Sequence, residues 1–226
     1  MQTLVPGKLT VLTNIPFEPM EYLNGDGKLA GFDIDLIQAI GKKLGIEVVI
    51  EQKDWDLMFE LVKQHKVDLA ISSISVTTER AQEFNFSIPY LEAGQVILIE
   101  SSNSSNIFNA SNLFGKKVVS QKNTTSAIVA KEAKADVREL DNNVGDQEVQ
   151  ELISHKIDAI ILDYVAGVTL VKKYPNIKIV GSQLTEEYYA ILFPLSEYNL
   201  TDAVNSILRE MKQNGELDAL KKRWLQ

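Results

Sequence analysis

Cysteine is absent from the 226-residue sequence, which excludes disulfide bonds, thiolate metal ligands and cysteine nucleophiles. Long apolar runs are absent as well, since stretches such as Val96 to Ile99 are far shorter than the roughly 20 residues of a membrane-spanning helix. Histidine occurs only twice, and the sequence shows no clustered metal ligands, phosphate-binding glycine loop or Ser/His/Asp set. We therefore expect no metal, no cofactor and no catalytic residue.

Basic residues are in the minority: 23 Lys and Arg against 31 Asp and Glu give a net charge of -8. A nucleic-acid surface needs clustered basic side chains. The one basic cluster, Lys221 to Arg223, is expected on a solvated face of the last helix, near its C-terminus. The composition therefore argues against a nucleic-acid partner.

One sequence pattern occurs twice, at Glu60 to Ile71 and again at Glu151 to Ile161. The two copies lie about 90 residues apart, too far for a solenoid repeat. Each predicts an amphipathic helix that ends in His-Lys, then a short apolar strand that runs into polar residues. The pattern indicates two similar lobes, and polar groups just past strand ends are where open α/β sheets bind ligands.

Helical and strand patterns alternate in both halves, as an α/β fold requires. We expect helices at 32–44, 55–65, 126–134, 147–155, 200–212 and 216–224, and a further helix that starts at 77–80 and ends at 86–90. We expect strands at 8–13, 47–50, 67–71, 95–100, 116–120, 157–162, 177–180 and 188–193. Lobe 1 is expected at 1–91 and 187–226 and lobe 2 at 95–183. Hinge segments near 91–95 and 183–187 would join them.

Arg80 is the strongest candidate for ligand binding, because it follows a serine-rich strand exit and lies in the first turn of an expected helix. A guanidinium offers a planar fork that matches a carboxylate, and Ser75 would add a further donor. The alternative is a surface arginine that pairs with Glu79 or Glu83.

Asp163 occupies the corresponding strand exit in the second copy, so it would supply the negative charge that an amino-acid zwitterion needs beside Arg80. Thr124 and Thr125 precede a helix, where hydroxyls and backbone N–H groups favour an anion. Ordinary helix capping would explain all three residues equally well.

Two aromatic residues could sandwich a ligand side chain. Phe17 lies in a proline-rich loop and Trp55 at a helix start, and both could act by apolar contact or cation–π attraction. Aromatic residues at such positions also serve as core residues.

Several motifs together resemble the polar amino-acid-binding proteins of ABC importers. They are Gly31 to Leu36, Asp54-Trp55, Asp68 to Arg80, Phe86 to Tyr90, Gln121 to Ser126, Asp158 to Asp163 and Gly215 to Trp224. The resemblance covers nearly the whole chain. It implies a type II periplasmic-binding-protein fold: two α/β lobes, each a mixed sheet flanked by helices, joined by two hinge strands.

The resemblance also implies roles for individual residues. Arg80, with Ser75 and Thr125, would bind the ligand carboxylate, and Asp163 with the Ser73 carbonyl would bind the ammonium group. Phe17 and Trp55 would flank the side chain. The ligand tip would lie near Asn14, Glu18, Ser72 and Gln121, with Thr124 beside the ligand as well.

Ligand specificity is less directly implied. Many family members have an acidic residue where this chain has Asn14, whereas the Ser72-Ser73-x-Ser75 run is similar to lysine/arginine/ornithine- and histidine-binding members. Glu18 could restore a nearby negative charge. We expect a basic amino acid, with arginine first and glutamine next.

The expected protein is a binding protein and not an enzyme: a monomer that delivers an amino acid to a membrane permease. The resemblance implies a periplasmic or extracytoplasmic location, and a lipid anchor on the precursor stays open. One alternative is a cyclohexadienyl dehydratase-like enzyme with Glu18 as proton donor. Another is the ligand-binding domain of a sensor kinase or receptor.

Overall fold

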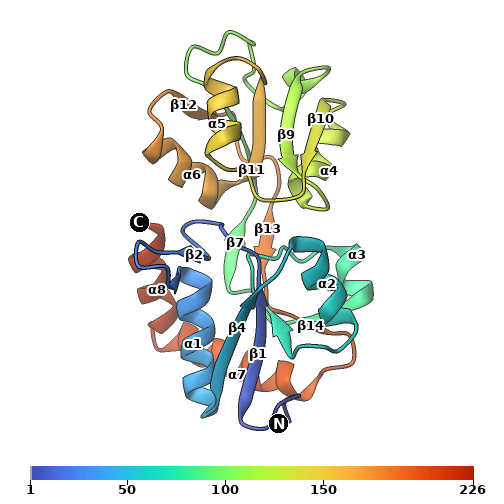
Figure 1. Cartoon of the computed structure of the whole chain (residues 1–226), viewed down its shortest axis with the longest axis vertical. Coiled ribbons are helices and arrows are strands. Elements are labelled where there is room, and N and C mark those ends of the chain that lie inside the picture. Colours follow the sequence, from blue (N-terminus) through green and yellow to red (C-terminus); the bar gives the residue numbers. More distant parts are fainter. Residues whose placement is uncertain (1) are drawn as a thin grey trace. The chain divides into compact units, whose positions relative to one another are not determined.

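The computed structural model describes residues 2–226, which divide into two compact units. Unit 1 consists of the residues up to Glu92 together with Tyr188–Gln226, and unit 2 is Ala93–Glu187. The chain therefore passes from unit 1 to unit 2 after Glu92 and returns after Glu187. Each unit has its own sheet and helices (Figure 1).

The sheet of unit 1 has the strand order β4-β1-β5-β14-β6. Its strands are β1 (Lys8–Thr13), β4 (Glu47–Gln52), β5 (Leu69–Ala70), β6 (Phe84–Phe86) and β14 (Leu192–Pro194). β1 is parallel to β4 and β5, whereas β14 is antiparallel to β5 and β6. The returning chain thus contributes β14 to a sheet that the first third of the sequence begins.

Five helices flank this sheet: α1 (Phe32–Leu44), α2 (Trp55–Lys63), α3 (Thr78–Glu83), α7 (Asn199–Gln213) and α8 (Glu216–Leu225). α1 has the predicted bounds, and Gly45 ends it with φ 70° and an N–H that donates to the carbonyls of Gly41 and Lys42. This left-handed conformation suits glycine, which has no Cβ to clash with the backbone.

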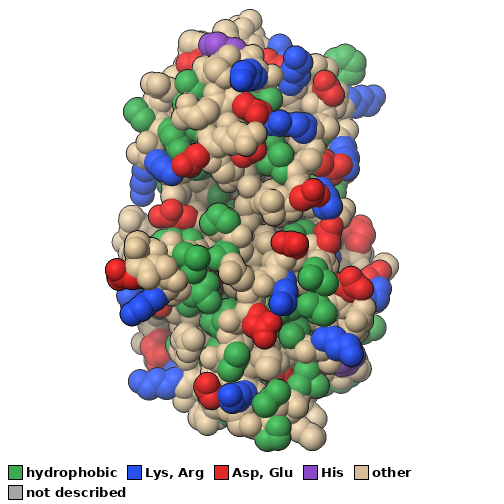
Figure 2. All heavy atoms as spheres, in the orientation of Figure 1, with side chains coloured by type: hydrophobic (Ala, Val, Ile, Leu, Met, Phe, Trp, Pro, Cys, Tyr) green, Lys and Arg blue, Asp and Glu red, His purple; other side chains and the backbone are tan. Residues whose placement is uncertain are grey.

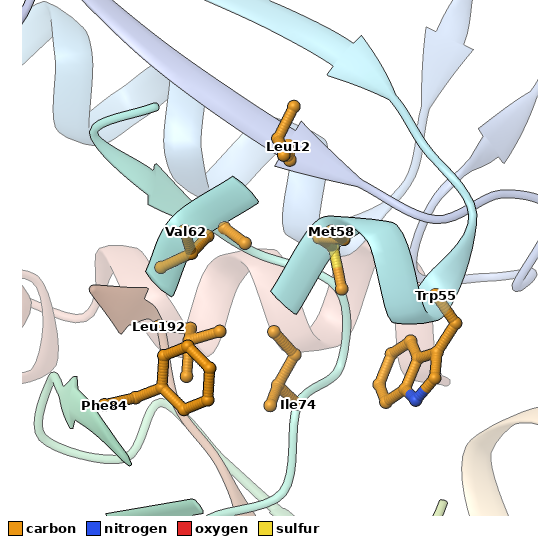
Figure 3. Close-up of a cluster of buried hydrophobic side chains, with 8 residues drawn as sticks. Leu12, Trp55, Met58, Val62, Ile74, Phe84 and Leu192 are labelled. Atoms are coloured by element: carbon orange, nitrogen blue, oxygen red, sulfur yellow. The ribbon is translucent and has the colours of Figure 1, made fainter. Parts of the chain in front are cut away.

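The core between α2 and the sheet is apolar. Figure 3 shows side chains from α2 pointing toward residues of β1, β6 and β14. The cluster consists of Leu12, Trp55, Met58, Val62, Ala70, Ile74, Phe84 and Leu192. Burial of this cluster holds the end of β5 in place, and Ser72, Ser73 and Ser75 follow shortly after that strand.

The sheet of unit 2 has the order β10-β9-β11-β8-β12. Its strands are β8 (Gln95–Glu100), β9 (Lys117–Gln121), β10 (Asp136–Leu140), β11 (Ala159–Asp163) and β12 (Ile177–Val180). β9 is parallel to β10 and β11, and β8 is antiparallel to β11 and β12. The helices are α4 (Thr125–Glu132), α5 (Asp146–Ile153), α6 (Tyr164–Lys173) and the 3-10 turn Ala110–Leu113.

Two small sheets complete the structure. β2 (Tyr22–Leu23) pairs with β3 (Leu29–Ala30), and β7 (Leu91–Ala93) pairs with β13 (Glu187–Tyr189). Both chain passages between the units lie within this second pair of strands.

The α/β prediction and the fold implied by the resemblance are confirmed, with corrections to individual elements. The single strand expected at 188–193 is wrong: β13 pairs with β7, and β14 joins a different sheet. Between them, Ala190 donates its N–H to Ile74 O and Ile191 to Ser87 Oγ. The sequence analysis also missed α6, β10 and the short strands β2, β3 and β6, and α3 ends at Glu83, before the expected end of its helix.

The repeated His-Lys pair has the same conformation in both units. His65 and His155 have φ 54° and 57°, and each follows the last turn of its helix. Lys66 N–H donates to Leu61 O and Lys156 N–H to Glu151 O, the six-to-one hydrogen bond of a Schellman motif. These left-handed residues end α2 and α5 earlier than the sequence pattern predicted.

Acidic and basic side chains are interspersed on the face shown in Figure 2, with no continuous basic area there among the described residues. None of the helices in residues 2–226 is both long enough and apolar enough to span a bilayer. Within the same residues, no group of three or more His, Asp or Glu side chains could hold a metal ion.

Candidate functional site

In unit 1, the segment after β5 carries the three predicted serines, all of them buried. Ser73 has φ 50°, a left-handed conformation that is uncommon for a residue with a Cβ. Ser72 Oγ accepts a hydrogen bond of 2.9 Å from Asn14 N, and the Asn14 amide donates to Lys53 O at 2.9 Å. The structure therefore brings the predicted residues Asn14 and Ser72 into direct contact.

Arg80 lies in α3, and its own N–H donates to Thr77 Oγ1, the cap of that helix. Its Nη1 donates to Ser75 O at 2.8 Å. The guanidinium carbon lies 5.5 Å from the Trp55 ring centroid and 5.1 Å from that of Phe59. Two aromatic faces and one carbonyl thus orient a half-buried planar cation.

Trp55 has the core role considered from the sequence, and its ring also lies against Arg80. It is 8% exposed and belongs to the core cluster, with its ring 5.0 Å from that of Phe59 in an edge-to-face arrangement. The same ring contacts the Arg80 guanidinium. Phe17 is half-buried and Glu18 is exposed in the loop that contains the cis peptide bonds before Pro16 and Pro19.

Two acids that the sequence analysis did not single out lie behind the serines. Glu21 is 1% exposed and Asp33 is fully buried. Ser72 Oγ donates to Glu21 at 2.9 Å, Ser73 N donates to Asp33 at 2.7 Å, and the Tyr90 hydroxyl donates to Asp33 at 3.0 Å. These contacts join the pair to the predicted ligand-binding segment.

Burial raises the pKa of both acids, because a low-dielectric environment disfavours the charged form. The pKa of Asp33 rises to about 6, although hydrogen bonds from Ser73 N–H and Tyr90 oppose the rise. Burial raises the pKa of Glu21 well above its usual range, and the neighbouring Asp33 charge raises it further.

In unit 2, Thr124 caps α4. Its Oγ1 accepts from Ala127 N at 3.3 Å and donates to Gln121 O at 2.6 Å. A hydrogen bond thus joins the predicted residues Gln121 and Thr124. The Thr124 hydroxyl caps α4, as the capping alternative predicted.

A glutamine that the sequence analysis did not single out connects the other candidates of unit 2. The Gln95 Nε2 donates to Thr125 Oγ1 at 3.0 Å and to Asp163 Oδ1, while Gln95 Oε1 accepts from Ser126 Oγ at 2.6 Å. Gln95 lies opposite Asp163 in the β8–β11 register. One amide side chain therefore orients the hydroxyl of Thr125 and the carboxylate of Asp163.

Glu187 is a second carboxylate in this network and is 8% exposed. It accepts hydrogen bonds from Thr125 Oγ1 at 2.9 Å and from Thr185 Oγ1 at 2.6 Å. A threonine hydroxyl has one proton. Since that of Thr125 goes to Glu187, the group of Thr125 that remains suited to an anion is its backbone N–H at the start of α4.

The sequence offers a signal for only one of the missed residues. Asp33 precedes Leu36, Ile37 and Ile40 at helical spacing, so it lies on the buried face of α1, where an acid needs partners. Strand pairing brings Gln95 to Asp163, and chain return brings Glu187 to Thr125. Nothing in the local sequence predicts these two contacts.

The predicted site residues fall into two groups. Unit 1 holds Asn14, Phe17, Glu18, Trp55, Ser72, Ser73, Ser75 and Arg80, and unit 2 holds Gln121, Thr124, Thr125 and Asp163. Each group contains buried hydrogen-bonded polar residues. Unit 1 holds an oriented cation, and unit 2 holds oriented carboxylates.

Residues 9–226 match the family model described as bacterial extracellular solute-binding proteins, family 3. The arginine-binding extracellular protein ArtP of Bacillus subtilis is 31% identical over 221 residues, covering 96% of this chain and 86% of that protein. The L-cystine-binding protein TcyJ of Escherichia coli K12 is 29% identical, with 96% and 82% covered.

Solved structures give the same result. An ancestral arginine-binding protein bound to arginine is 37% identical, with a TM-score of 0.89 and coverage of 97% of this chain and 99% of that one. A mutant of ArgBP from T. maritima is 32% identical, with a TM-score of 0.90 and coverage of 96% and 95%. An ancestral amino acid-binding protein described as a precursor of cyclohexadienyl dehydratase is also 32% identical, with a TM-score of 0.90 and coverage of 97% and 96%.

Proposed function

Because the chain belongs to family 3 of the bacterial extracellular solute-binding proteins, we propose that it captures one polar L-amino acid for an ABC transporter permease. Ligand contacts with both units would favour the closed state of a hinge, so that binding energy drives closure. Arginine is our leading ligand and glutamine the second. A relative named as arginine-binding and another named as glutamine-binding support this choice.

The observation that carries this proposal is that each unit holds one oriented charge, a cation in unit 1 and a carboxylate in unit 2. A zwitterion needs a cationic fork for its carboxylate and an anion for its ammonium group. Arg80 is held by Trp55, Phe59 and the Ser75 carbonyl, and Asp163 is held by the Gln95 amide. Such preorganisation lowers the entropy that binding must overcome.

We assign the ligand carboxylate to Arg80, the Ser75 hydroxyl and the Thr125 N–H, and the ammonium group to Asp163 and the Ser73 carbonyl. Phe17 and Trp55 would flank the ligand side chain, and Asn14, Glu18, Ser72, Gln121 and Thr124 would surround its end. Glu187 adds a second carboxylate to unit 2. A second carboxylate favours a ligand with a second positive charge, such as the guanidinium of arginine. This is our physical reason for placing arginine before glutamine.

We propose no catalytic step for this site. A dehydratase needs a proton donor that reaches its substrate. The buried acids Glu21 and Asp33 are at most 1% exposed, and Glu18 lies exposed in its loop. An assay with prephenate and arogenate tests this alternative directly, and turnover that depends on Glu18 would support it.

Calorimetric titration with each of the twenty L-amino acids and cystine tests the proposed function. We expect one tight ligand with a dissociation constant of about 1 μM, or about -8 kcal/mol. Arg80→Ala should lose binding, whereas Arg209→Ala on the exposed part of α7 should keep it. Wild-type affinity in Arg80→Ala, or no heat from any amino acid, would contradict the proposal.

We also propose that the protein acts as an extracytoplasmic monomer. Sedimentation velocity with and without the ligand measures its oligomeric state. A stable dimer would contradict this part of the proposal and would leave the ligand assignment unaffected.

A further inference from the structure

The acid pair Glu21 and Asp33 in unit 1 is buried more deeply than any role in ligand contact requires. Their exposed fractions are 1% and 0%. They come from different elements, since Glu21 precedes β2 and Asp33 lies in the first turn of α1. Two adjacent carboxylates removed from water cannot both be ionised at low cost.

No basic side chain in the described part of the chain forms an ion pair with either acid. None of the ion pairs found within residues 2–226 includes Glu21 or Asp33. The titratable groups that face the pair are the two acids themselves and Tyr90, and the remaining donors are the neutral groups of Ser72 and Ser73. A hydrogen bond between the two carboxyl groups contributes to the environment of both acids.

The donors are distributed unequally. Asp33 Oδ2 receives the Ser73 N–H at 2.7 Å and the Tyr90 hydroxyl at 3.0 Å, whereas Glu21 receives the Ser72 hydroxyl at 2.9 Å. The Ser73 hydroxyl lies 3.4 Å from both acids and has one proton to give. Asp33 is therefore the better site for the negative charge and Glu21 the better site for a proton.

The same hydrogen bonds reach the predicted ligand residues. Asp33 holds the N–H of Ser73, whose positive φ of 50° turns the chain just after β5. Glu21 holds the Ser72 hydroxyl, which in turn accepts from Asn14 N at 2.9 Å. A change in the charge of the pair would therefore act on Ser72, Ser73 and Asn14 without touching a ligand.

We propose that Glu21 and Asp33 share one proton and act as positioning residues, with protonated Glu21 and ionised Asp33 holding Ser72 and Ser73 in their ligand-binding conformation. This inference rests on the proposed function, because it concerns the affinity of the same site. Loss of the shared proton replaces the hydrogen bond between the two carboxyl groups with repulsion between two adjacent buried charges, which displaces the acids and the serines that they hold.

Calorimetric titration with L-arginine and L-glutamine between pH 6 and pH 8.5 tests the inference. Glu21→Gln cannot lose a proton but keeps a donor, so it should bind within about threefold of wild type at pH 7. It should also keep its affinity as the pH rises, whereas wild type should weaken. Glu21→Leu removes the nearer acceptor of the Ser72 hydroxyl and leaves only Asn14 O at 3.4 Å, so it should lose affinity roughly tenfold or more.

Tyr90→Phe is the gentler variant if Glu21→Leu does not fold. It removes one donor from Asp33 and should weaken binding by roughly fivefold. Glu47→Gln, whose side chain is 64% exposed on β4, is the matched control and should follow wild type at every pH. Circular dichroism identifies which variants are folded.

Equal affinities for wild type, Glu21→Leu and Tyr90→Phe would overturn the inference and leave the proposed function intact. The inference would also be overturned if the affinity of Glu21→Gln falls with rising pH as that of wild type does. Such a result would show that the proton on Glu21 does not cause the pH dependence. A wild-type protein that binds no amino acid would overturn the proposed function and this inference with it.

Discussion

The two copies of the repeated pattern have the same scaffold and different chemistry at its end. Each has the left-handed His after its helix, and each has an Asp that accepts from a neighbouring parallel strand. Asp68 accepts from Thr10 N at 2.7 Å and Asp158 from Lys117 N at 2.8 Å. The residues assigned to the ligand differ past the strand.

Past the strand, unit 1 has serines backed by the buried acids Glu21 and Asp33, while unit 2 has Asp163 held by Gln95. The comparison shows that backbone-fixing residues are repeated, whereas the residues assigned to the ligand differ between units. Opposite charges on the two units suit a zwitterion. The differences between the copies, rather than the repeat, should therefore control affinity.

The largest expected effect comes from removing the cation of unit 1. Arg80→Ala should lower the affinity for the bound amino acid by at least roughly 100-fold, because a ligand carboxylate would lose its bidentate partner. Arg80→Lys keeps the charge without the fork and should recover part of the loss. Titration calorimetry measures both variants, and equal losses in the two would show that charge without fork geometry contributes nothing.

The next largest effect concerns the pH dependence of stability, which should have opposite signs for a buried acid of unit 1 and one of unit 2. The pKa of Asp33 is raised to about 6, so between about pH 4 and pH 6 the folded protein binds more protons than the unfolded chain, and stability falls as the pH rises. From pH 4 to pH 7, the double variant Glu21→Gln/Asp33→Asn should gain stability relative to wild type, on the order of 2 kcal/mol.

Asp158 in unit 2 should behave in the opposite way. Burial raises its pKa, but hydrogen bonds from Ser105 and Lys117 N–H outweigh burial and leave the pKa below its usual value. Asp158→Asn should therefore cost more stability at pH 7 than near pH 3. Urea unfolding between pH 3 and pH 7 measures how each substitution changes the free energy of unfolding with pH. The same direction of change for the acids of both units would contradict the predicted difference between them.

The two carboxylates of unit 2 should contribute unequally. Asp163→Asn should weaken binding of any amino acid, by roughly tenfold, because it removes the anion assigned to the ammonium group. Glu187→Gln should weaken arginine more than glutamine if Glu187 favours a second cation. Parallel titrations with the two ligands measure this difference, and an equal effect on both would assign Glu187 to support of Thr125 alone.

The smallest expected effect concerns the shared scaffold. His65→Gly and His155→Gly should each raise the free energy of unfolding by about 1 kcal/mol or less, because glycine adopts positive φ without steric cost. His155 also bonds to Ser104 Oγ at 3.2 Å, so its replacement should gain less. Thermal unfolding of the two variants checks the order, and a loss in either would show that the imidazole contributes packing.

Local sequence patterns were sufficient for much of the fold. The apolar period and Gly45 determined α1, and the repeated pattern located α2, α5, β5 and β11 to within a few residues. The single strand expected at 188–193 failed because its two ends pair with different partners, β7 and β5, which local periodicity cannot distinguish.

Candidate site residues divide in the same way. Arg80, Ser75 and Thr124 could be proposed because strand exits and helix starts are visible in the sequence. The partners that orient them could not be predicted: Arg80 of α3 lies over the Phe59 ring of α2, and strand register brings Asp163 to Gln95.

By itself, the sequence determined the alternation of strands and helices, the repeated scaffold and the charges at the strand exits, because each depends on neighbours within a few residues. The tertiary structure decided which acids are buried together and which hydroxyl proton goes to which carboxylate. Those outcomes depend on desolvation and on contacts between residues far apart in the chain, such as Glu21 with Ser72 and Thr125 with Glu187.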